Sequence, residues 1–320
     1  MNFHLPFSIS PFSEKINYKH PLLFMGSCFA EEIGTQMKNN KFNTLINPHG
    51  IIYNPISIGV ALRRYIYNNP LKETDLFYAN ECYYSLEHHS RFSNTNKQIC
   101  LVNINEQITL AHEQLKKAEW LFITLGSAFV YKHSATTTIV NNCHKLPQKL
   151  FTKELLKINE IEENYKLLIE ELVTFNSKLK IIFTVSPVRY IRDGIIENTR
   201  SKARLIEAVQ QLVTIHTNAF YFPAYEIMMD DLRDYRFYKA DLIHPNEQAI
   251  SYIFEKLKKT MLDEESHLIF EKVHDIIKAI THKPFHSDTK AHQQFKQRYV
   301  CRFLQLQEEY PFIEWNDFQL

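Results

Sequence analysis

The stretch PLLFMGSCFAEEIGTQM, residues 21–37, places an apolar run directly before Gly-Ser-Cys and a segment with helical periodicity. Consecutive apolar residues are typical of a strand covered on both faces, as in a parallel sheet. Two nucleophilic residue types, Ser27 and Cys28, stand where this strand would end and a helix would begin. The amide groups and dipole of a helix N-terminus favour negative charge, so the corner suits a nucleophile. Serine is also a common helix N-cap, and the local sequence by itself favours that simpler interpretation.

Strand and helix patterns alternate outward from this corner. The other β-type runs are residues 43–47, 119–126, 180–188 and 219–225. The helix-period segments are residues 28–40, 55–68, 105–118, 153–177 and 199–215, followed by an amphipathic stretch that ends near residue 257. Such alternation predicts a three-layer α/β domain with a mostly parallel sheet and right-handed crossovers.

Two histidine-containing regions interrupt the alternation. Residues 78–93 and 129–146 are typical of extended or hairpin excursions. Loops that leave a rigid α/β scaffold often line a functional site, so we expect these regions to contribute to one.

The pattern changes again after residue 262. Residues 264–281 and 288–308 read as two charged amphipathic helices, separated by THKPFHSD with Pro284. We therefore predict an α/β domain over residues 1–262 and a helical extension over 263–320 that packs on it.

Composition limits the classes of function. The chain has 320 residues, 45% of them hydrophobic, with 37 basic and 36 acidic residues. This balance argues against a nucleic-acid partner or an anionic membrane surface. We see no signal peptide and no apolar run of the roughly 20 residues that span a bilayer, so the expected location is cytoplasmic. Five scattered cysteines without a C-x-x-C pair suggest neither a zinc ribbon nor a disulfide framework.

A second motif, DLIHPN at residues 241–246, lies after the last β-type run. In a turn, Asp241 can reach the Nδ1 atom of His244, fix its tautomer and leave Nε2 to accept a proton from a nucleophile. The active crevice of an open α/β sheet lies beyond the carboxyl ends of its strands, where this turn and Ser27 can meet. The alternative is a capped helix start, with proline in the first turn.

The segment FMGSCFAEEIG, residues 24–34, resembles the signature of the GSCFA family, which belongs among the SGNH (GDSL-like) hydrolases. Similar blocks run through residues 47–55, 124–131, 142–149, 184–194 and 232–245, and the likeness extends to HKPFHSD at 282–288. The resemblance covers nearly the whole chain. It implies a flavodoxin-like α/β/α hydrolase fold, with serine in the first block and D-x-x-H in the last.

The resemblance also implies roles for individual residues. Ser27 matches the SGNH nucleophile, and Asp241 with His244 matches the acid and base. The second SGNH block supplies a glycine amide to the oxyanion hole, and Gly50 is its match. The third block normally reads G-x-N-D, whereas this chain has Gly126, Ser127, Ala128 and Phe129. The expected Asn donor is therefore missing, and its candidate replacements are Ser127, Asn142, His88, His89 and His144.

Three questions remain open: which residue is the nucleophile, whether histidines hold a metal, and what two arginines do. Cys28 is the intrinsically better nucleophile, but free cysteine is more often a small buried residue, and the family places serine at the attacking position. Histidines 88, 89, 144 and 244 raise the alternative of a metal, yet they lack the i, i+4 spacing of a metalloprotease, and we expect none. Arg189 and Arg192 either bind an anionic substrate group or pair with Asp193 or Glu197.

The sequence thus predicts a serine hydrolase of SGNH type, without a cofactor, that cleaves an O-acyl ester of a small molecule or carbohydrate. One alternative is a non-catalytic module that binds a glycan or a protein, because a fold does not fix a function. Another is acyl transfer to an alcohol by the same residues. Nothing in the sequence defines the oligomeric state.

Overall fold

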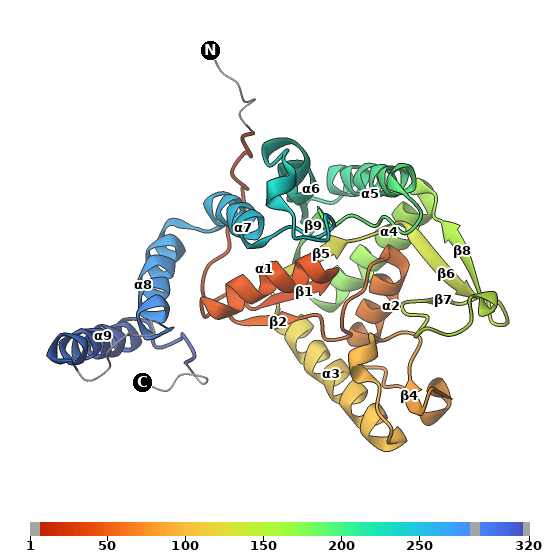
Figure 1. Cartoon of the computed structure of the whole chain (residues 1–320), viewed down its shortest axis with the longest axis horizontal. Coiled ribbons are helices and arrows are strands. Elements are labelled where there is room, and N and C mark those ends of the chain that lie inside the picture. The colour runs from red at the N-terminus through yellow and green to blue at the C-terminus, as the bar shows by residue number, and fades with distance from the viewer. Residues whose placement is uncertain (1–6, 282–288, 316–320) are drawn as a thin grey trace, which may run out of the picture.

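A computed structural model describes residues 7–281 and 289–315 of the chain. At its centre lies a five-stranded parallel sheet with the order β2-β1-β5-β9-β10 (Figure 1). This is the 2-1-3-4-5 order of flavodoxin-like doubly wound sheets. The strands are β1 (Leu22–Gly26), β2 (Thr44–Ile46), β5 (Trp120–Leu125), β9 (Lys180–Val185) and β10 (Ala219–Tyr221).

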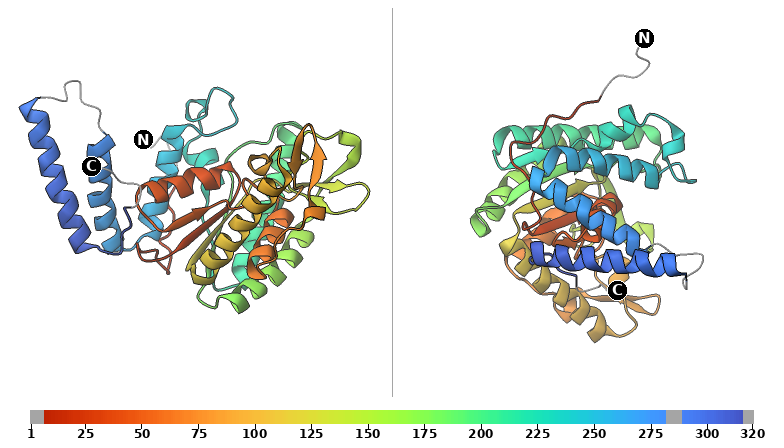
Figure 2. Two further views of the ribbon diagram at one scale, coloured as in Figure 1. Left: turned by 90° about the horizontal axis from the view of Figure 1, so that it is seen from below. Right: turned by 90° about the vertical axis from the view of Figure 1, so that its left-hand side faces the viewer.

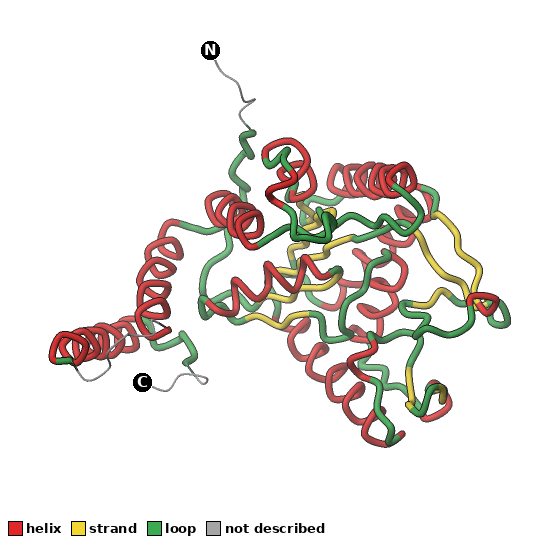
Figure 3. The backbone as a smooth tube through the Cα atoms, in the orientation of Figure 1, coloured by secondary structure: helices red, strands yellow, loops and turns green. Residues whose placement is uncertain are grey.

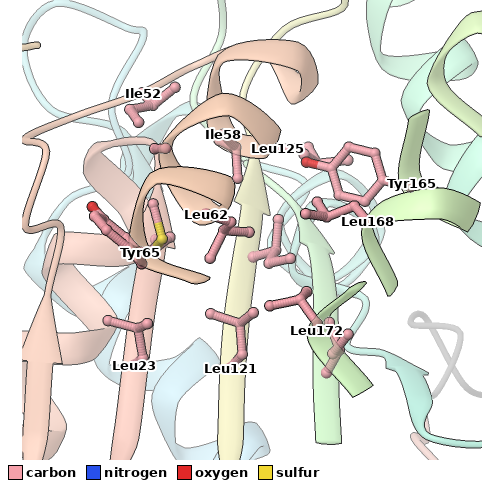
Figure 4. Packing of buried hydrophobic residues seen from close by; sticks show 14 of the residues in the cluster. Leu23, Ile52, Ile58, Leu62, Tyr65, Leu121, Leu125, Tyr165, Leu168 and Leu172 are labelled. Carbon is pink, nitrogen blue, oxygen red and sulfur yellow. The ribbon is translucent and has the colours of Figure 1, made fainter. Parts of the chain in front are cut away.

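The central strands are apolar at successive positions because helices cover both faces of the sheet. Leu23 of β1 and Leu121 of β5 face one hydrophobic core, whereas Leu22 and Trp120 face the other. Figure 4 shows the first core, where Leu23 and Leu121 lie below the α2 residues Leu62 and Tyr65. The predicted strand at 180–188 is shorter than expected and ends at Val185.

The helices divide between the two faces. One face is covered by α2 (Pro55–Ile66), α3 (Lys97–Lys117), α4 (Ile158–Phe175) and α5 (Ile195–Ile215). The other is covered by α1 (Cys28–Asn39), α6 (Ala224–Glu226) and α7 (Glu247–Met261). The prediction of a three-layer α/β/α fold with a mostly parallel sheet is confirmed.

Three predicted helix starts were wrong, and the smallest error is that α5 begins at Ile195 rather than at residue 199. The segment 153–177 begins as strand β8 (Phe151–Leu155), because its side chains alternate in exposure and pair with β6, and α4 starts only at Ile158. Conversely, α3 begins at Lys97 rather than at residue 105. The Asn96 side chain accepts a hydrogen bond from the Ile99 amide and caps the helix there.

Both histidine-containing regions form hairpins, as predicted. The first pairs β3 (Phe77–Ala79) with β4 (Cys82–Tyr84), and the second forms an antiparallel sheet of β6 (Phe129–His133), β7 (Ile139–Val140) and β8. They lie at the same end of the molecule (Figure 2). Backbone hydrogen bonds from the amides of Asn141 and Asn142 to the Leu86 carbonyl join their connecting loops, at 2.9 and 3.2 Å.

The C-terminal helices lie at the end of the molecule opposite β6 and β8 (Figures 1 and 3). They are α8 (Glu264–Thr281) and α9 (Lys290–Glu309). Phe270 of α8 and Phe303 of α9 belong to the same buried core as α1 and α7, so the extension packs on the sheet domain. The predicted Pro284 break and the HKPFHSD block lie outside the described residues. None of the helices in the described ranges is long and apolar enough to cross a bilayer.

Candidate active site

The corner after β1 is held by its neighbours on both sides. The Gly26 amide donates to Asn47 Oδ1 at 2.8 Å, and the Ile52 amide donates to the Gly26 carbonyl at 2.9 Å. On the other side, the Ser27 amide donates to the Thr124 carbonyl of β5 at 3.1 Å. The position of Ser27 is therefore fixed by three separate parts of the chain.

Ser27 occupies the N-cap position of α1 but its side chain does not cap the helix. The residue has φ −69° and ψ 174°, as an N-cap should, yet its hydroxyl accepts no amide hydrogen. Only 1% of the residue is exposed, and Oγ has no hydrogen-bond partner among the described residues. A buried hydroxyl without a partner is unfavourable and unusual. The N-cap interpretation does not explain this serine, and it stays a candidate nucleophile.

Cys28 is a weaker candidate than its position suggests. Burial raises the pKa of the Cys28 thiol, outweighing the hydrogen bond from the Phe29 amide, which lowers it. The thiolate is the reactive form of cysteine, so a raised pKa removes the advantage expected at a helix N-terminus.

The turn at residues 241–244 forms the predicted Asp–His pair. Asp241 Oδ1 accepts the amides of Ile243 and His244 at 2.9 and 3.0 Å, and Oδ2 lies 2.7 Å from His244 Nδ1. These two amides, with the imidazole, hold the pKa of Asp241 well below its usual range. An ionised carboxylate only accepts hydrogen bonds, so Nδ1 carries a proton, and Nε2 is the acceptor in the tautomer of the neutral ring that this contact selects. Asn246 caps α7 by accepting the Ala249 amide at 3.0 Å, which leaves His244 free of that task.

Arg189 holds this turn in place through hydrogen bonds to its carbonyl groups. Its amide donates to the Ile243 carbonyl at 3.2 Å, its guanidinium donates to the Leu242 carbonyl at 3.4 Å, and the guanidinium carbon lies 4.2 Å from the Tyr238 ring centroid. Of the two alternatives for this arginine, no described ion pair joins Arg189 to Asp193 or Glu197. Those carboxylates instead contact Lys153 and Arg200.

The segment that leads into this turn contacts the N-terminal part of α1. Lys239 Nζ is 3.5 Å from Glu32 Oε1, and Figure 1 shows the segment before α7 running over the end of the sheet near the start of α1. Strand order thus brings the Asp–His pair to the helix that carries Ser27. No described hydrogen bond joins Ser27 Oγ to His244.

The predicted backbone donors of an oxyanion hole are already engaged. The Gly50 amide donates to the Asn47 carbonyl at 2.7 Å, and the Ser27 amide donates to Thr124 as described above. The first hydrogen bond closes the tight turn at residues 47–50, and the second continues the parallel pairing of β1 with β5 past Gly26. The assignment of these two amides as free donors is therefore wrong for this arrangement.

Residues 126–128 do not supply a substitute donor. The amides of Gly126 and Ser127 both donate to the Tyr53 carbonyl, at 2.8 and 2.9 Å. Ser127 Oγ lies 3.2 Å from Ser201 Oγ of α5 and accepts the Phe129 amide at 3.1 Å. The Ser127 hydroxyl joins a loop to a helix and does not replace the missing Asn.

Two polar groups near the corner were missed from the sequence. Asn47 Nδ2 is buried without a partner among the described residues, and it is held close to Gly26 because Oδ1 of the same amide accepts the Gly26 N–H. Lys202 is 1% exposed and donates to the carbonyls of Gly126 and Ser186, both at 2.7 Å. Burial lowers the pKa of Lys202 to about 7. The sequence could have indicated that Lys202 is buried, since Leu205 and Val209 follow it at i+3 and i+7 on the apolar face of α5.

The remaining predicted residues lie together around a cavity of about 800 Å³. His89, Asn142 and His144 line it, whereas Ser27, Asp241, His244 and Arg189 are not among its described lining residues. His144 Nε2 donates to the Ser85 carbonyl at 2.8 Å, so this histidine is held in place by the hairpin region. The structure therefore separates the predicted site into a nucleophile corner and an adjoining cavity.

Within the described residues, no group of three or more His, Cys, Asp or Glu side chains is arranged to hold a metal ion. Of the adjacent pair His88 and His89, His89 is among the described residues that line the cavity, and the segment is a turn rather than the expected extended strand. The His88 ring is buried and stacks on His49 with 3.9 Å between ring centroids.

The His49–His88 pair predicts that acid destabilises the fold. Burial lowers the pKa of His88 from 6.5 to about 3 and also holds that of His49 well below 6.5. Below pH 6.5 the unfolded chain takes up protons that the folded chain excludes, so the free energy of unfolding falls as the pH decreases. We expect each histidine to cost up to about 1.4 kcal/mol per pH unit in this range.

Urea unfolding followed by circular dichroism between about pH 7 and pH 5 measures this effect. The His88→Asn variant lacks one of the two groups, so its stability should depend less steeply on pH even if it is less stable throughout. His133→Asn, a change on strand β6, is the matched control and should keep the wild-type slope. An unchanged slope in His88→Asn would contradict the linkage.

Comparison with known sequences identifies the family of the chain. A model of the GSCFA family matches residues 21–257, which include β1, the Ser27 corner and the Asp241–His244 turn. A second model, described as GSCFA domain protein, C-terminal domain, matches residues 273–319. No curated protein matches the chain by sequence. Because the first model covers well over half of its length, the chain belongs to the GSCFA family.

Proposed function

We propose that the protein is a serine hydrolase of SGNH type that cleaves an O-acyl ester. The observation that carries this proposal is the buried Ser27 hydroxyl, which does not cap the helix and has no hydrogen-bond partner among the described residues. The Asp241–His244 pair, which could activate this hydroxyl, is already formed in the turn before α7. The 2.7 Å contact between Asp241 and Nδ1 leaves Nε2 as the proton acceptor that a serine nucleophile requires.

In the proposed reaction, Ser27 Oγ attacks the acyl carbonyl and His244 Nε2 takes its proton. The carbonyl becomes a tetrahedral oxyanion, which collapses when His244 returns the proton to the leaving alcohol. Asp241 keeps the imidazole oriented and stabilises its charged form. Water then attacks the acyl-enzyme by the same route, releasing the acid and restoring Ser27.

The oxyanion needs hydrogen-bond donors. We assign Asn47 Nδ2 to this role, because it is a buried donor without a described partner and its own amide group is bonded to Gly26, the residue before Ser27. Catalytic hydrogen bonds are often loose before substrate binds, so Ser27 and His244 are expected to approach when the site is occupied. An alcohol in place of water at the second step would make the same residues an acyltransferase.

A specific observation favours a second candidate, a non-catalytic binding module. The amides of Ser27 and Gly50 donate to carbonyls, and Ser27 Oγ makes no hydrogen bond to His244. In that case the residues of the corner have a structural role, and the adjoining cavity is the functional part of the molecule.

Covalent labelling with a fluorophosphonate probe separates the two candidates. A serine activated by His244 attacks the phosphorus atom and expels fluoride, which leaves a stable phosphonyl ester on Oγ. We expect mass spectrometry of peptides to place the label on Ser27 in the wild-type protein and in Cys28→Ala.

The label should be absent from Ser27→Ala and strongly reduced in His244→Ala. A wild-type protein that remains unlabelled under conditions that label a known serine hydrolase would sink the catalytic proposal. The non-catalytic binding module would then be the remaining candidate.

A further inference from the structure

The cavity of about 800 Å³ is built by five parts of the chain that are far apart in the sequence. They are residues 51–53, His89, strand β6, the loop 141–148 with the adjoining strand β8, and the loop 190–193. Small-molecule sites usually measure a few hundred to about 1,000 Å³ and combine apolar walls with a few placed polar groups. The volume therefore suits a ligand the size of a sugar with a substituent.

The lining of the cavity is positively charged. Lys145, Lys153 and Arg192 line it, and of the described lining residues Asp193 alone carries a carboxylate. Asp193 forms an ion pair with Lys153, whose ammonium also lies 4.9 Å from the Tyr190 ring centroid. Arg192 also interacts electrostatically with Asp193 and Tyr190, so three cationic side chains share this one carboxylate. A cavity with a positively charged lining attracts an anion.

The histidines add hydrogen-bonding groups rather than charge. Burial lowers the pKa of both His89 and His144, so both rings are neutral near pH 7. Asn141 Oδ1 is buried without a partner among the described residues, and Asn141 lines the cavity. An acceptor of this kind suits a hydroxyl group of a ligand. The rings of Tyr53, Tyr131, Phe151 and Tyr190 provide apolar faces beside these polar groups.

The cavity shares its walls with the nucleophile corner. The Tyr53 carbonyl accepts the amides of Gly126 and Ser127 at the end of β5, and the neighbouring Ile52 amide donates to Gly26. On the opposite side, Tyr190 follows Arg189, which braces the Asp–His turn. Residues of the cavity wall are therefore sequence neighbours of the residues that hold both halves of the proposed catalytic machinery in place.

We propose that this cavity binds a polyhydroxylated anion, a sugar bearing a carboxylate or a phosphate, whose charge is attracted by Lys145 and Arg192. As a corollary that rests on the proposed function, the anionic sugar is the alcohol portion of the ester whose acyl group is transferred to Ser27. Binding itself does not depend on catalysis, because none of the residues that carry it is Ser27, Asp241 or His244.

Isothermal titration calorimetry at low ionic strength tests the proposal with glucuronate, glucose 6-phosphate and glucose as probes. At least one of the two anions should bind about tenfold or more tightly than glucose, since a charge-assisted hydrogen bond contributes roughly a factor of ten in affinity. Comparison of the two anions tells whether the cavity prefers a planar carboxylate or a phosphate. The double variant Lys145→Gln, Arg192→Gln should lose this preference and keep its weak affinity for glucose.

Two control variants show whether anion binding depends on the cavity and whether it is independent of Ser27 labelling. Arg200→Gln removes a charge on α5 outside the cavity lining and should bind like the wild type. Ser27→Ala should bind the anion with wild-type affinity although it is not labelled. Equal affinity for glucose and both anions, no binding of either anion, or wild-type affinity in the double variant would each overturn the proposal and leave Ser27 labelling unaffected.

Discussion

Replacing Ser27 with alanine is expected to lower kcat/KM for p-nitrophenyl acetate by about 10⁴-fold, because the loss of a triad nucleophile removes the acyl-enzyme route. The fold should be retained, since the hydroxyl has no described partner to lose. Spectrophotometric release of p-nitrophenol by wild type and variant measures the change, and unfolding curves check that both proteins are folded.

Cys28→Ala is the matched control at the next position. Burial raises the pKa of the Cys28 thiol in the wild-type protein and makes it a poor nucleophile, so Cys28→Ala should keep its activity within a small factor of the wild type. Full activity in Ser27→Ala together with loss of activity in Cys28→Ala would assign the attack to the thiol. Equal activity in all three proteins would place the reaction outside this corner.

The largest effect on stability is expected from Gly26→Ala. Gly26 has φ +130°, and an added Cβ would lie 2.1 Å from the Thr124 carbonyl oxygen in the middle of the sheet. The oxygen is a backbone atom of β5 and accepts the Ser27 amide, so it cannot move aside without breaking the corner. Backbone strain and overpacking together should lower the free energy of unfolding by about 3 to 5 kcal/mol. Urea unfolding followed by circular dichroism provides the measurement.

Gly194→Ala separates the two causes of this loss. Gly194 also has a positive φ, +89°, but an added Cβ would meet no atom within 4 Å. This variant should therefore lose only the strain component, about 1 to 3 kcal/mol. If Gly26→Ala proves no less stable than Gly194→Ala, the close approach of β1 to β5 at this glycine is wrong.

The elements with local causes were predictable. The apolar run of β1 reports burial on both faces, and the Asp241–His244 pair forms because residues three apart meet within a single turn. The start of α3 was placed too far along because the capping residue Asn96 was overlooked, and strand β8 was mistaken for helix. Both errors lie at element boundaries, where one hydrogen bond or one strand partner outweighs periodicity.

The sequence by itself determined the layered fold, the Ser27 corner and the Asp–His turn, because periodicity and short spacings depend on neighbours along the chain. Only the tertiary structure decided which donors are free. The Ser27 amide bonds to a carbonyl of β5, the Gly50 amide is taken up by the turn at residues 47–50, and Lys202 donates to carbonyls that follow β5 and β9. The cavity likewise exists only where five distant parts of the chain meet. Such contacts depend on strand order and on the packing of loops, which no local pattern records.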